Sequence, residues 1–431
     1  MQPTGITARK GVTVLHLVSA SAAYSSTFVL REVRQLRHLG LETVIGQLRP
    51  VFGDMSTTGF EELAAIVVKP RWLSLELIAG IVYYARKQPR RLWRYLVLIV
   101  RSGRQVNNAI KMLYVLLASM TLAYKSRGSQ IGHARAHFLH TEALAAYFVS
   151  GFLHVPYSIT VHTISVHYPP TVIREVVGGA SFVVADTHQV YEFLQVLGGP
   201  CGRLRLIRNG VPLDELTFRD GRVASDPPIV LAAGYLCPKK GFDVLLKACS
   251  ILSQRGVRFR CVLVGDGKER KNLAKLRNEL GLENEVEMPG NLCIDDLRNW
   301  YYHATIFVMP SVALSDASTD GLPTVVIEAL ACGTPVIGTN TAAIPEVVLD
   351  GRTGLLVPAG APDAIADRIQ LLLSQDRLRR SLAHEGRGLI EQEFDLRRNS
   401  ESLAGLILSH ATIPQPCSHR SNELPSVAEI S

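Results

Sequence analysis

Long apolar runs are missing from this sequence, although 47% of its 431 residues are hydrophobic. A membrane-spanning helix needs roughly 18 or more apolar residues in succession, and no stretch provides them. The seven cysteines never form a C-x-x-C pair, so neither a zinc site nor a disulfide framework is predicted. We therefore expect a globular protein of a reducing compartment, the cytoplasm, that does not cross the bilayer.

Glycine is missing where a nicotinamide dinucleotide would need it. The first apolar stretch, Val12–Val18, alternates like a strand rather than a secretion signal, and the following SASAAYSSTF contains no glycine. A dinucleotide site requires a G-x-G-x-x-G turn at that point. A Rossmann oxidoreductase is therefore disfavoured, and a sugar-nucleotide epimerase on the same fold is a weak alternative.

Acidic residues are nearly missing from residues 71–125, where Glu76 is the only one. Helices are predicted in YYARKQPRRLWRYLVLIVRSGRQ and IKMLYVLLASMTLAYKSR, which place arginine and lysine beside tryptophan, tyrosine and leucine. Such basic amphipathic helices lie on anionic membrane surfaces. A helical insertion that packs on its own domain, with solvated arginines, is an equal alternative. Nucleic acid is not an expected partner, because no recognition fold accompanies the charge.

What the sequence does contain is two series of alternating strands and helices. The first has strand-like runs at Val12–Val18, Glu42–Leu48, Tyr157–Val161, Ser181–Ala185 and Leu204–Ile207, and a helix at Thr27–His38. The second has strands at Ile229–Ala233, Arg260–Gly265, Val286–Met288, Ile306–Met309 and Pro335–Gly338, and helices at Phe242–Gln254, Glu269–Leu280, Asp295–His303 and Thr324–Cys332. Because a single core stops growing near about 250–300 residues, we predict two α/β domains, each with a doubly wound parallel sheet.

The domain limits follow from a lapse in apolar periodicity over residues 214–230. We expect an N-terminal domain over 1–213, with the basic helical insertion at 71–125, and a C-terminal domain over 227–395. A terminal helix over 396–412 is expected to pack back on the N-terminal domain. The Pro- and Ser-rich residues 413–431 are expected to be disordered.

Open α/β sheets bind ligands at the carboxyl ends of their strands, so the loops after the second series of strands are the candidates for a site. The loop AAGYLCPKKGF ends in Lys239, Lys240 and Gly241 just before a helix, where lysines suit a phosphate group. Taken alone, these lysines are equally well explained as surface residues. The next loop, LVGDGKER, places Gly265 and Asp266 in a glycine-rich turn, which is a weak signal by itself.

The stretch TDGLPTVVIEALACGTPVI carries the strongest signal. A flexible glycine, Gly321, precedes Pro323, which suits the start of a helix because its missing N–H costs nothing there. Free amides at that helix start can bind a pyrophosphate. Glu328 follows in a helix otherwise made of apolar residues, so its carboxylate needs a partner such as a ribose diol. A nearby lysine or arginine is the alternative partner.

The spacing of Asp320 and Glu328 within this stretch resembles the E-x7-E region of the retaining family 4 glycosyltransferases, which have the GT-B fold. PKKGFDVLLKA, LVGDGKERKNL, IPEVVLDGRTGLLVP and LIRNGVPLDEL match other segments of that family in the right order. HLVSASAAYSSTFVLREVRQLRHLG is similar to the subgroup that makes colanic-acid-like exopolysaccharides. The resemblance covers nearly all of residues 12–400 and implies two Rossmann-like domains that face each other across a cleft.

The resemblance also implies an activity, namely retaining, metal-independent sugar transfer without a cofactor. The implied donor is UDP- or GDP-linked, and the implied acceptor is an oligosaccharide of the lipid-linked kind at the inner face of the plasma membrane. Lys240 would neutralise the donor phosphates, Asp320 would contact the sugar, Glu328 would bind the ribose, and His162 would lie near donor and acceptor. The other implied donor-binding residues are Lys239, Gly265, Asp266, Gly321, Leu322, Pro323 and Thr324.

Four positions depart from the pattern of that family. Tyr235 stands where the family has an arginine shortly before the phosphate-binding lysine, and Asp320 replaces the first glutamate. Ser165 replaces the aspartate of an H-x-x-D pattern, and Ser26 replaces the glutamate of an SETF pattern. These departures leave one alternative open, a catalytically impaired glycosyltransferase-like assembly subunit at the membrane.

Overall fold

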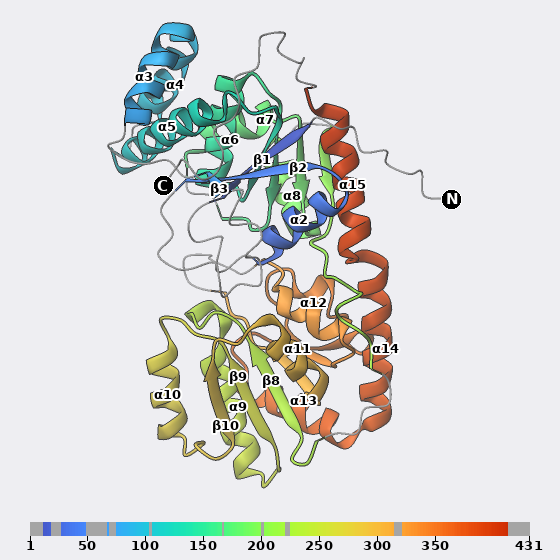
Figure 1. Ribbon diagram of the computed structural model, residues 1–431. Coiled ribbons are helices and arrows are strands. Elements are labelled where there is room, and N and C mark those ends of the chain that lie inside the picture. Colours follow the sequence, from blue (N-terminus) through green and yellow to red (C-terminus); the bar gives the residue numbers. More distant parts are fainter. Residues whose placement is uncertain are drawn as a thin grey trace, which may run out of the picture.

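The protein has two α/β domains, and its last helices run along both of them (Figure 1). The computed structural model describes residues 12–18, 27–48, 67–68, 75–102, 106–165, 168–199, 202–219, 225–313 and 321–412. The expected disordered tail, residues 413–431, lies outside this part of the chain.

Seven parallel strands form the N-terminal sheet, in the order β3-β2-β1-β4-β5-β6-β7. They are β1 (Thr13–Val18), β2 (Glu42–Gln47), β3 (Val67–Val68), β4 (Ile131–His137), β5 (Tyr157–Val161), β6 (Phe182–Ala185) and β7 (Leu204–Leu206). Every residue of β1, β4, β5 and β6 is buried, as expected for a parallel sheet covered on both faces. The central strand β4 is not among the predicted strands, because its IGHARAH sequence lacks the apolar run of a typical buried strand.

Helices pack on both faces of this sheet (Figure 1). They are α2 (Thr27–His38), α3 (Leu75–Lys87), α4 (Pro89–Arg101), α5 (Val106–Ser126), α6 (Thr141–Leu153), α7 (Pro170–Gly179) and α8 (His188–Val196). The basic insertion has three helices rather than two helical segments, because Pro89 occupies the first position of α4 and separates it from α3. The inner side of α5 packs on α6 and buries Met112, Val115 and Leu116 in the N-terminal core.

Six parallel strands form the C-terminal sheet, in the order β10-β9-β8-β11-β12-β13. They are β8 (Ile229–Ala233), β9 (Arg260–Val264), β10 (Val286–Gly290), β11 (Ile306–Met309), β12 (Val336–Thr339) and β13 (Gly354–Val357). The helices of this domain are α9 (Phe242–Gln254), α10 (Arg270–Glu279), α11 (Ile294–His303), α12 (Thr324–Ala331), α13 (Pro362–Ser374) and α14 (Asp376–Glu393). Strands β8 to β12 and helices α9 to α12 follow the predicted second series closely, whereas β13, α13 and α14 were not predicted.

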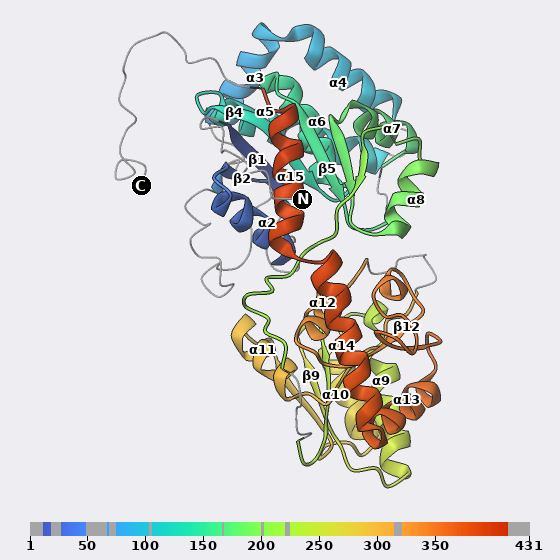
Figure 2. The same cartoon turned by 90° about the vertical axis from the view of Figure 1, so that its right-hand side faces the viewer.

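The chain returns to the N-terminal domain at its end. Helix α15 (Leu396–His410) packs against α2 of the N-terminal domain, and α14, which precedes it, lies along the C-terminal domain (Figure 2). The segment that returns to the N-terminal domain lies beside the segment that leaves it. Val211 donates its N–H to the carbonyl of Phe394 at 2.8 Å, and its own carbonyl accepts the N–H of Leu396 at 3.2 Å. The two chain crossings therefore form one joint between the domains.

Each sheet reverses its strand order at one point, between β1 and β4 in the N-terminal domain and between β8 and β11 in the C-terminal domain. Such a switch point opens a crevice at the carboxyl ends of the two strands. The loops that leave β8 and β11 are therefore the structural place to look for a ligand site. None of the described helices combines the length and the apolar character that a membrane span requires.

Candidate active site

Two glycine turns touch at the carboxyl edge of the C-terminal sheet. A Cβ on Gly265 would lie 2.0 Å from the carbonyl oxygen of Gly234, so the turns after β8 and β9 leave no room for a side chain there. Gly265 has a φ of 134°, which also favours glycine. The neighbouring Asp266 is exposed and its Oδ1 accepts the N–H of Gly267 at 2.7 Å. Gly265 and Asp266 thus form a compact turn at the position the sequence predicted.

The two predicted phosphate-binding lysines lie on the loop after β8. Lys239 and Lys240 end the short 3-10 helix η3 (Pro238–Lys240), and both are half-buried. The Lys239 carbonyl accepts the N–H of Val312, which follows β11, at 2.9 Å. The Lys240 side chain passes over Gly234, with its Cε 3.5 Å from the place of a Cβ there. The loops on either side of the switch point are therefore joined at the lysines.

The amino end of α12 lies against the N-terminal domain. A Cβ on Gly321 would lie 2.2 Å from the carbonyl oxygen of His162, which directly follows β5. Pro323 is the N-cap residue of α12 rather than its first helical residue, and its side chain forms no cap hydrogen bond. Leu322 and Thr324 are half-buried beside it. Asp320, the predicted sugar contact, lies outside the described residues, as does Ser26.

Glu328 is already bonded in this structure, and its partners are protein side chains. Its Oε1 accepts from Nη1 of Arg31 on α2 at 2.6 Å, and its Oε2 accepts from the hydroxyl of Tyr301 on α11 at 2.9 Å. Burial, together with the adjacent carboxylate, raises the pKa of Tyr301 well above its usual value, so its hydroxyl stays a donor. The arginine partner that the sequence left as the alternative is therefore present, and it comes from the other domain.

His162 is held by a buried polar group on the N-terminal side of the interface. Its Nδ1 lies 2.9 Å from Oδ2 of Asp186, and the same Oδ2 accepts from Nδ2 of Asn209 at 2.8 Å. The His162 Nε2 lies 3.4 Å from Nδ1 of His137. Because a carboxylate only accepts, the short contact with Asp186 fixes the His162 proton on Nδ1.

Glu346 is a second carboxylate that bonds to residues of the other domain. Glu346 accepts the N–H groups of His188 and Gln189 at 2.9 and 3.0 Å, which start helix α8, and it forms an ion pair with Arg208. A negative charge at a helix amino end is favourable. Burial raises the pKa of Glu346, but the hydrogen bonds from Arg208 and the two amides outweigh it and hold the pKa below 4.5.

Arg135, two residues before His137, is the largest fully buried side chain of the described residues. This arginine is fully buried on β4, and its Nε and Nη2 donate to the two carboxylate oxygens of Glu32 at 2.7 and 3.0 Å. Its Nη2 also donates to the hydroxyl of Thr160 at 2.5 Å. Burial opposes the charge of Glu32, but Arg135 outweighs it and lowers the carboxyl pKa. Both groups are therefore charged and fully paired.

The arrangement suits an anionic ligand between two domains. The described donors on the C-terminal side are backbone amides at α12 and lysines after β8. On the N-terminal side the backbone of His162, whose imidazole is held by Asp186, lies against Gly321. Such donors stabilise a leaving phosphate by charge and position rather than by strong base chemistry. Two open doubly wound domains that contact each other near their switch points define the GT-B fold.

Known proteins agree with this class. Residues 214–389, which make up most of the C-terminal domain, match the family described as Glycosyl transferases group 1. The glycosyltransferase WcaL of Salmonella typhimurium, which is named for colanic acid biosynthesis, is 31% identical to this chain over 216 residues. These residues are 50% of this chain and 53% of that protein. The amylovoran biosynthesis glycosyltransferase AmsK of Erwinia amylovora is 30% identical over 182 residues, 42% of this chain and 44% of that one. The chain thus spans about half the length of these relatives.

Solved structures confirm the predicted fold over 92–93% of the chain. HepE of Anabaena, solved in complex with UDP, has a TM-score of 0.70 at 16% identity, and the match covers 92% of this chain and 100% of that one. A glycosyltransferase of Rickettsia africae has a TM-score of 0.70 at 18% identity, with 93% and 98% covered. At these identities the likeness establishes the GT-B fold alone.

The sequence interpretation missed the polar partners on the N-terminal side. Arg31, Glu32 and Arg135 lie on α2 and β4, and Asp186 and Asn209 follow β6 and β7. The position of Asp186 and Asn209 directly after strand-like runs was an available signal, since polar residues at strand ends gather at one edge of a parallel sheet. Arg135 offered none, because β4 itself was not predicted.

Proposed function

We propose that the protein is a retaining glycosyltransferase that moves a sugar from a nucleoside diphosphate sugar to an oligosaccharide acceptor in exopolysaccharide or cell-surface glycan synthesis. One observation carries the proposal: the lysine loop after β8 is bonded to the loop after β11 at the switch point, and the start of α12 lies against the His162 carbonyl of the other domain. The family of the C-terminal domain and the relatives named for exopolysaccharide synthesis support it.

The donor is held by its phosphates. Lys240, with Lys239 beside it, neutralises the diphosphate, and the amides of Gly321, Leu322 and Thr324 bind its oxygens. The turns at Gly234 and Gly265 carry no side chains, so the donor can approach the edge of the sheet closely. UDP is the first candidate base because HepE was solved with UDP-glucose, and GDP is the second because a relative from Mycolicibacterium smegmatis is named as GDP-mannose-dependent.

Glu328 binds the donor ribose in this proposal, and Asp320 contacts the sugar. The Glu328 side chain is only 7% exposed in the structure, so a ribose reaches it only when Arg31 moves away. Donor binding is thereby coupled to a movement of α2 relative to α12. The support for this step is the single ion pair that joins these two helices.

The chemistry needs little from the protein beyond position and charge. The acceptor hydroxyl attacks from the face that the leaving diphosphate occupies, and a phosphate oxygen takes its proton, so the anomeric configuration is retained. The protein stabilises the leaving phosphate with Lys240 and the α12 amides. His162, fixed by Asp186, orients the acceptor hydroxyl and the sugar. In this proposal no metal ion touches the diphosphate.

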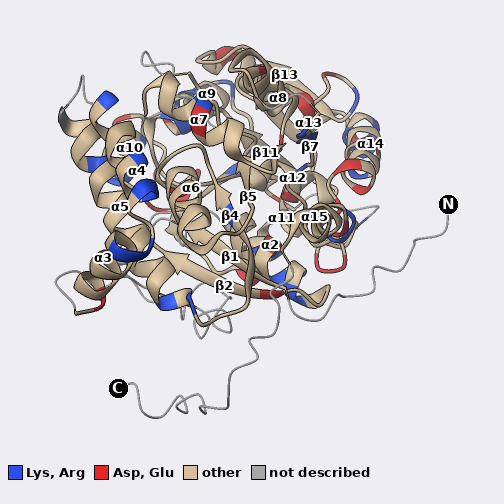
Figure 3. Cartoon of the chain, turned by 90° about the horizontal axis from the view of Figure 1, so that it is seen from above, with Lys and Arg blue, Asp and Glu red and all other residues tan. Residues whose placement is uncertain are grey.

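The acceptor is a lipid-linked saccharide at an anionic membrane. Most of the exposed large apolar side chains of the described chain lie on the insertion, and they are Leu75, Ile78, Val82, Tyr83, Trp93, Val100, Ile110 and Leu113. Exposed cations alternate with them, and they are Arg86, Lys87, Arg90, Arg94, Arg101 and Lys111. Figure 3 shows these basic segments of α3, α4 and α5 on one side of the molecule. Apolar and cationic groups on one face suit the surface of an anionic bilayer.

A second function is favoured by two particular observations. Tyr235, which is 57% exposed, stands where the resemblance expects an arginine, and Glu328 is already neutralised by Arg31. A glycosyltransferase-like assembly subunit that binds no donor accounts for both.

A thermal-shift screen separates the two functions. UDP-, GDP- and ADP-sugars are added in turn to the full chain, and the enzyme proposal expects one donor class to raise the unfolding temperature. If no nucleotide sugar or free nucleotide raises it, the enzyme proposal is wrong and the assembly role stands.

A further inference from the structure

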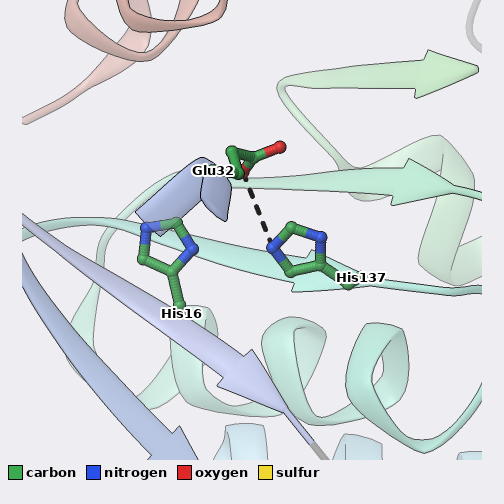
Figure 4. A group of neighbouring side chains, drawn as sticks. All are labelled: His16, Glu32 and His137. Carbon is green, nitrogen blue, oxygen red and sulfur yellow. Dashed lines mark ion pairs between the residues drawn. The ribbon is translucent and has the colours of Figure 1, made fainter. Parts of the chain in front are cut away.

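We propose that His16, Glu32 and His137 bind a divalent transition-metal ion, with zinc as the ion that their donor atoms suit best. The site lies inside the N-terminal domain and goes beyond the proposed sugar transfer. Figure 4 shows the three side chains, which come from β1, α2 and β4 and converge on one point.

The spacing of the three side chains is close to that of a metal site whose ligands have not yet moved in around the ion. The candidate ligand atoms of the three residues all lie within 4.8 Å of one another. Two imidazole nitrogens and one carboxylate oxygen form the donor set that zinc and its first-row neighbours prefer. Three protein ligands leave a fourth position of a tetrahedral ion for a water molecule.

The decisive observation is a set of buried nitrogen atoms that have no hydrogen-bond partner. His16 is fully buried, and neither of its ring nitrogens has a hydrogen-bond partner among the described residues. His137 is also buried, and its Nε2 has no hydrogen bond, although Oε1 of Glu32 lies 3.6 Å away. Buried polar atoms in native proteins are nearly always satisfied. A cation between these atoms would satisfy them together.

The hydrogen bonds around the group direct a lone pair into the site. Asp186 fixes the His162 proton on Nδ1, so His162 Nε2 accepts from Nδ1 of His137 at 3.4 Å. His137 therefore carries its proton on Nδ1, and its Nε2 presents a lone pair toward Glu32. That lone pair and the carboxylate repel each other without a cation. The ligand His137 is thus oriented through its other nitrogen by His162, which Asp186 orients in turn, and such outer-shell bonds are common in metal sites.

Arg135 shapes the site in two ways. Its bidentate contact fixes the Glu32 carboxylate in place, yet Oε1 keeps a second lone-pair position for an ion. Its positive charge also opposes a second cation nearby. We therefore infer a site that is filled at moderate ion concentration rather than one that the fold requires.

The ion would steady the helix that reaches across the domain interface. Glu32 is adjacent to Arg31 on α2, and Arg31 bonds to Glu328 of the C-terminal domain. A metal bond to Glu32 would anchor this part of α2 to β1 and β4. The ion is thus a positioning element, separate from the donor diphosphate.

Metal titration of the full chain after chelator treatment tests the proposal. We expect one Zn²⁺ per chain by isothermal titration, a rise in unfolding temperature with Zn²⁺, and the visible absorption of tetrahedral Co²⁺ when Co²⁺ replaces it. In His16→Leu all three signals should disappear. This variant should fold, because leucine removes two unsatisfied buried nitrogens. The matched control His303→Ala, at an exposed histidine on α11, should keep all three.

A milder variant tests the outer shell. Asp186→Asn leaves the three ligands intact and should weaken Zn²⁺ binding by about 10–100-fold. The proposal is overturned if the folded wild type shows no Co²⁺ absorption, or if His16→Leu binds Zn²⁺ as tightly as the wild type does. Because these readouts involve no nucleotide, their failure leaves the proposed sugar transfer untouched.

Discussion

Arg31 donates to Glu328 at 2.6 Å and so joins helix α2 of the N-terminal domain to helix α12 of the C-terminal domain. The two side chains are 10% and 7% exposed. A pair with so little water around it is costly to break on one side only, because the remaining charge stays buried. The carboxylate proposed for the donor ribose is therefore held by the opposite domain until a ligand arrives.

A double-mutant cycle on this pair measures its strength. Arg31→Leu leaves Glu328 with Tyr301 as its only described partner, so we expect the free energy of unfolding to fall by about 3 kcal/mol. The double variant Arg31→Leu/Glu328→Leu removes both charges and should recover most of that loss. Urea unfolding of the wild type, both single variants and the double variant gives the coupling. Strictly additive losses would show that the pair does not hold the domains.

Gly321 tests the contact between the start of α12 and the N-terminal domain. In Gly321→Ala the new Cβ would meet the His162 carbonyl at 2.2 Å, so one domain must shift, and we expect a loss of about 1–3 kcal/mol in unfolding free energy. Gly128→Ala is the matched control, since a Cβ there has no neighbour within 4 Å. Equal stability of the two variants would mean that the domains do not meet at Gly321.

The pKa of Glu346 predicts how the stability of the contact between the domains changes in acid. Its pKa is below 4.5 in the folded protein, because its bonds to Arg208 and the two amides of α8 outweigh the opposing effect of burial. A depressed carboxyl pKa stabilises the fold above the unfolded-state pKa, and this stabilisation is lost as the pH falls through the folded-state pKa. The difference in unfolding free energy between the wild type and Glu346→Gln should be constant near neutral pH and shrink below pH 4.5. A difference that stays constant in acid would contradict the assigned ion pair.

Trp93 tests the membrane face of the insertion. This side chain is 68% exposed on α4, among exposed arginines, and Trp93→Ser should reduce flotation of the full chain with vesicles that contain anionic phosphatidylglycerol. Val196→Ser is the control, because Val196 is 88% exposed on α8, outside the insertion. Neutral phosphatidylcholine vesicles should bind neither wild type nor variants strongly. Equal flotation of Trp93→Ser and the wild type would place the membrane contact elsewhere.

Much of the fold was predictable because apolar periodicity and turn residues agree in the C-terminal domain. The strands Ile229–Ala233 and Ile306–Met309 and the helix Phe242–Gln254 have the predicted limits. Periodicity failed at β4, where buried charged and imidazole side chains replace the apolar run. Such a strand is stable only because Glu32, Thr160 and Ser158 satisfy Arg135, and these partners come from distant parts of the chain.

The candidate site likewise has a part that local sequence motifs predict and a part that they do not. Lys239, Lys240 and Gly321 were proposed from local motifs. The structure places the two lysines beside the switch point of the C-terminal sheet and Gly321 against the His162 carbonyl. The sequence also showed that Glu328 needs a partner. It could not show that the partner is Arg31, which is 297 residues away, because no local pattern encodes a contact between domains.

The most direct test of the proposed function is isothermal titration of UDP into three forms of the full chain, with GDP as the second nucleotide. The wild type should bind one of them, and Arg31→Gln should bind it more tightly, by about 5–150-fold, because the ribose no longer competes with the guanidinium for Glu328. The double variant Arg31→Gln/Glu328→Gln should lose the gain and bind more weakly than the wild type. Equal nucleotide affinity in all three forms, or no binding of either nucleotide, would contradict a donor site at Glu328.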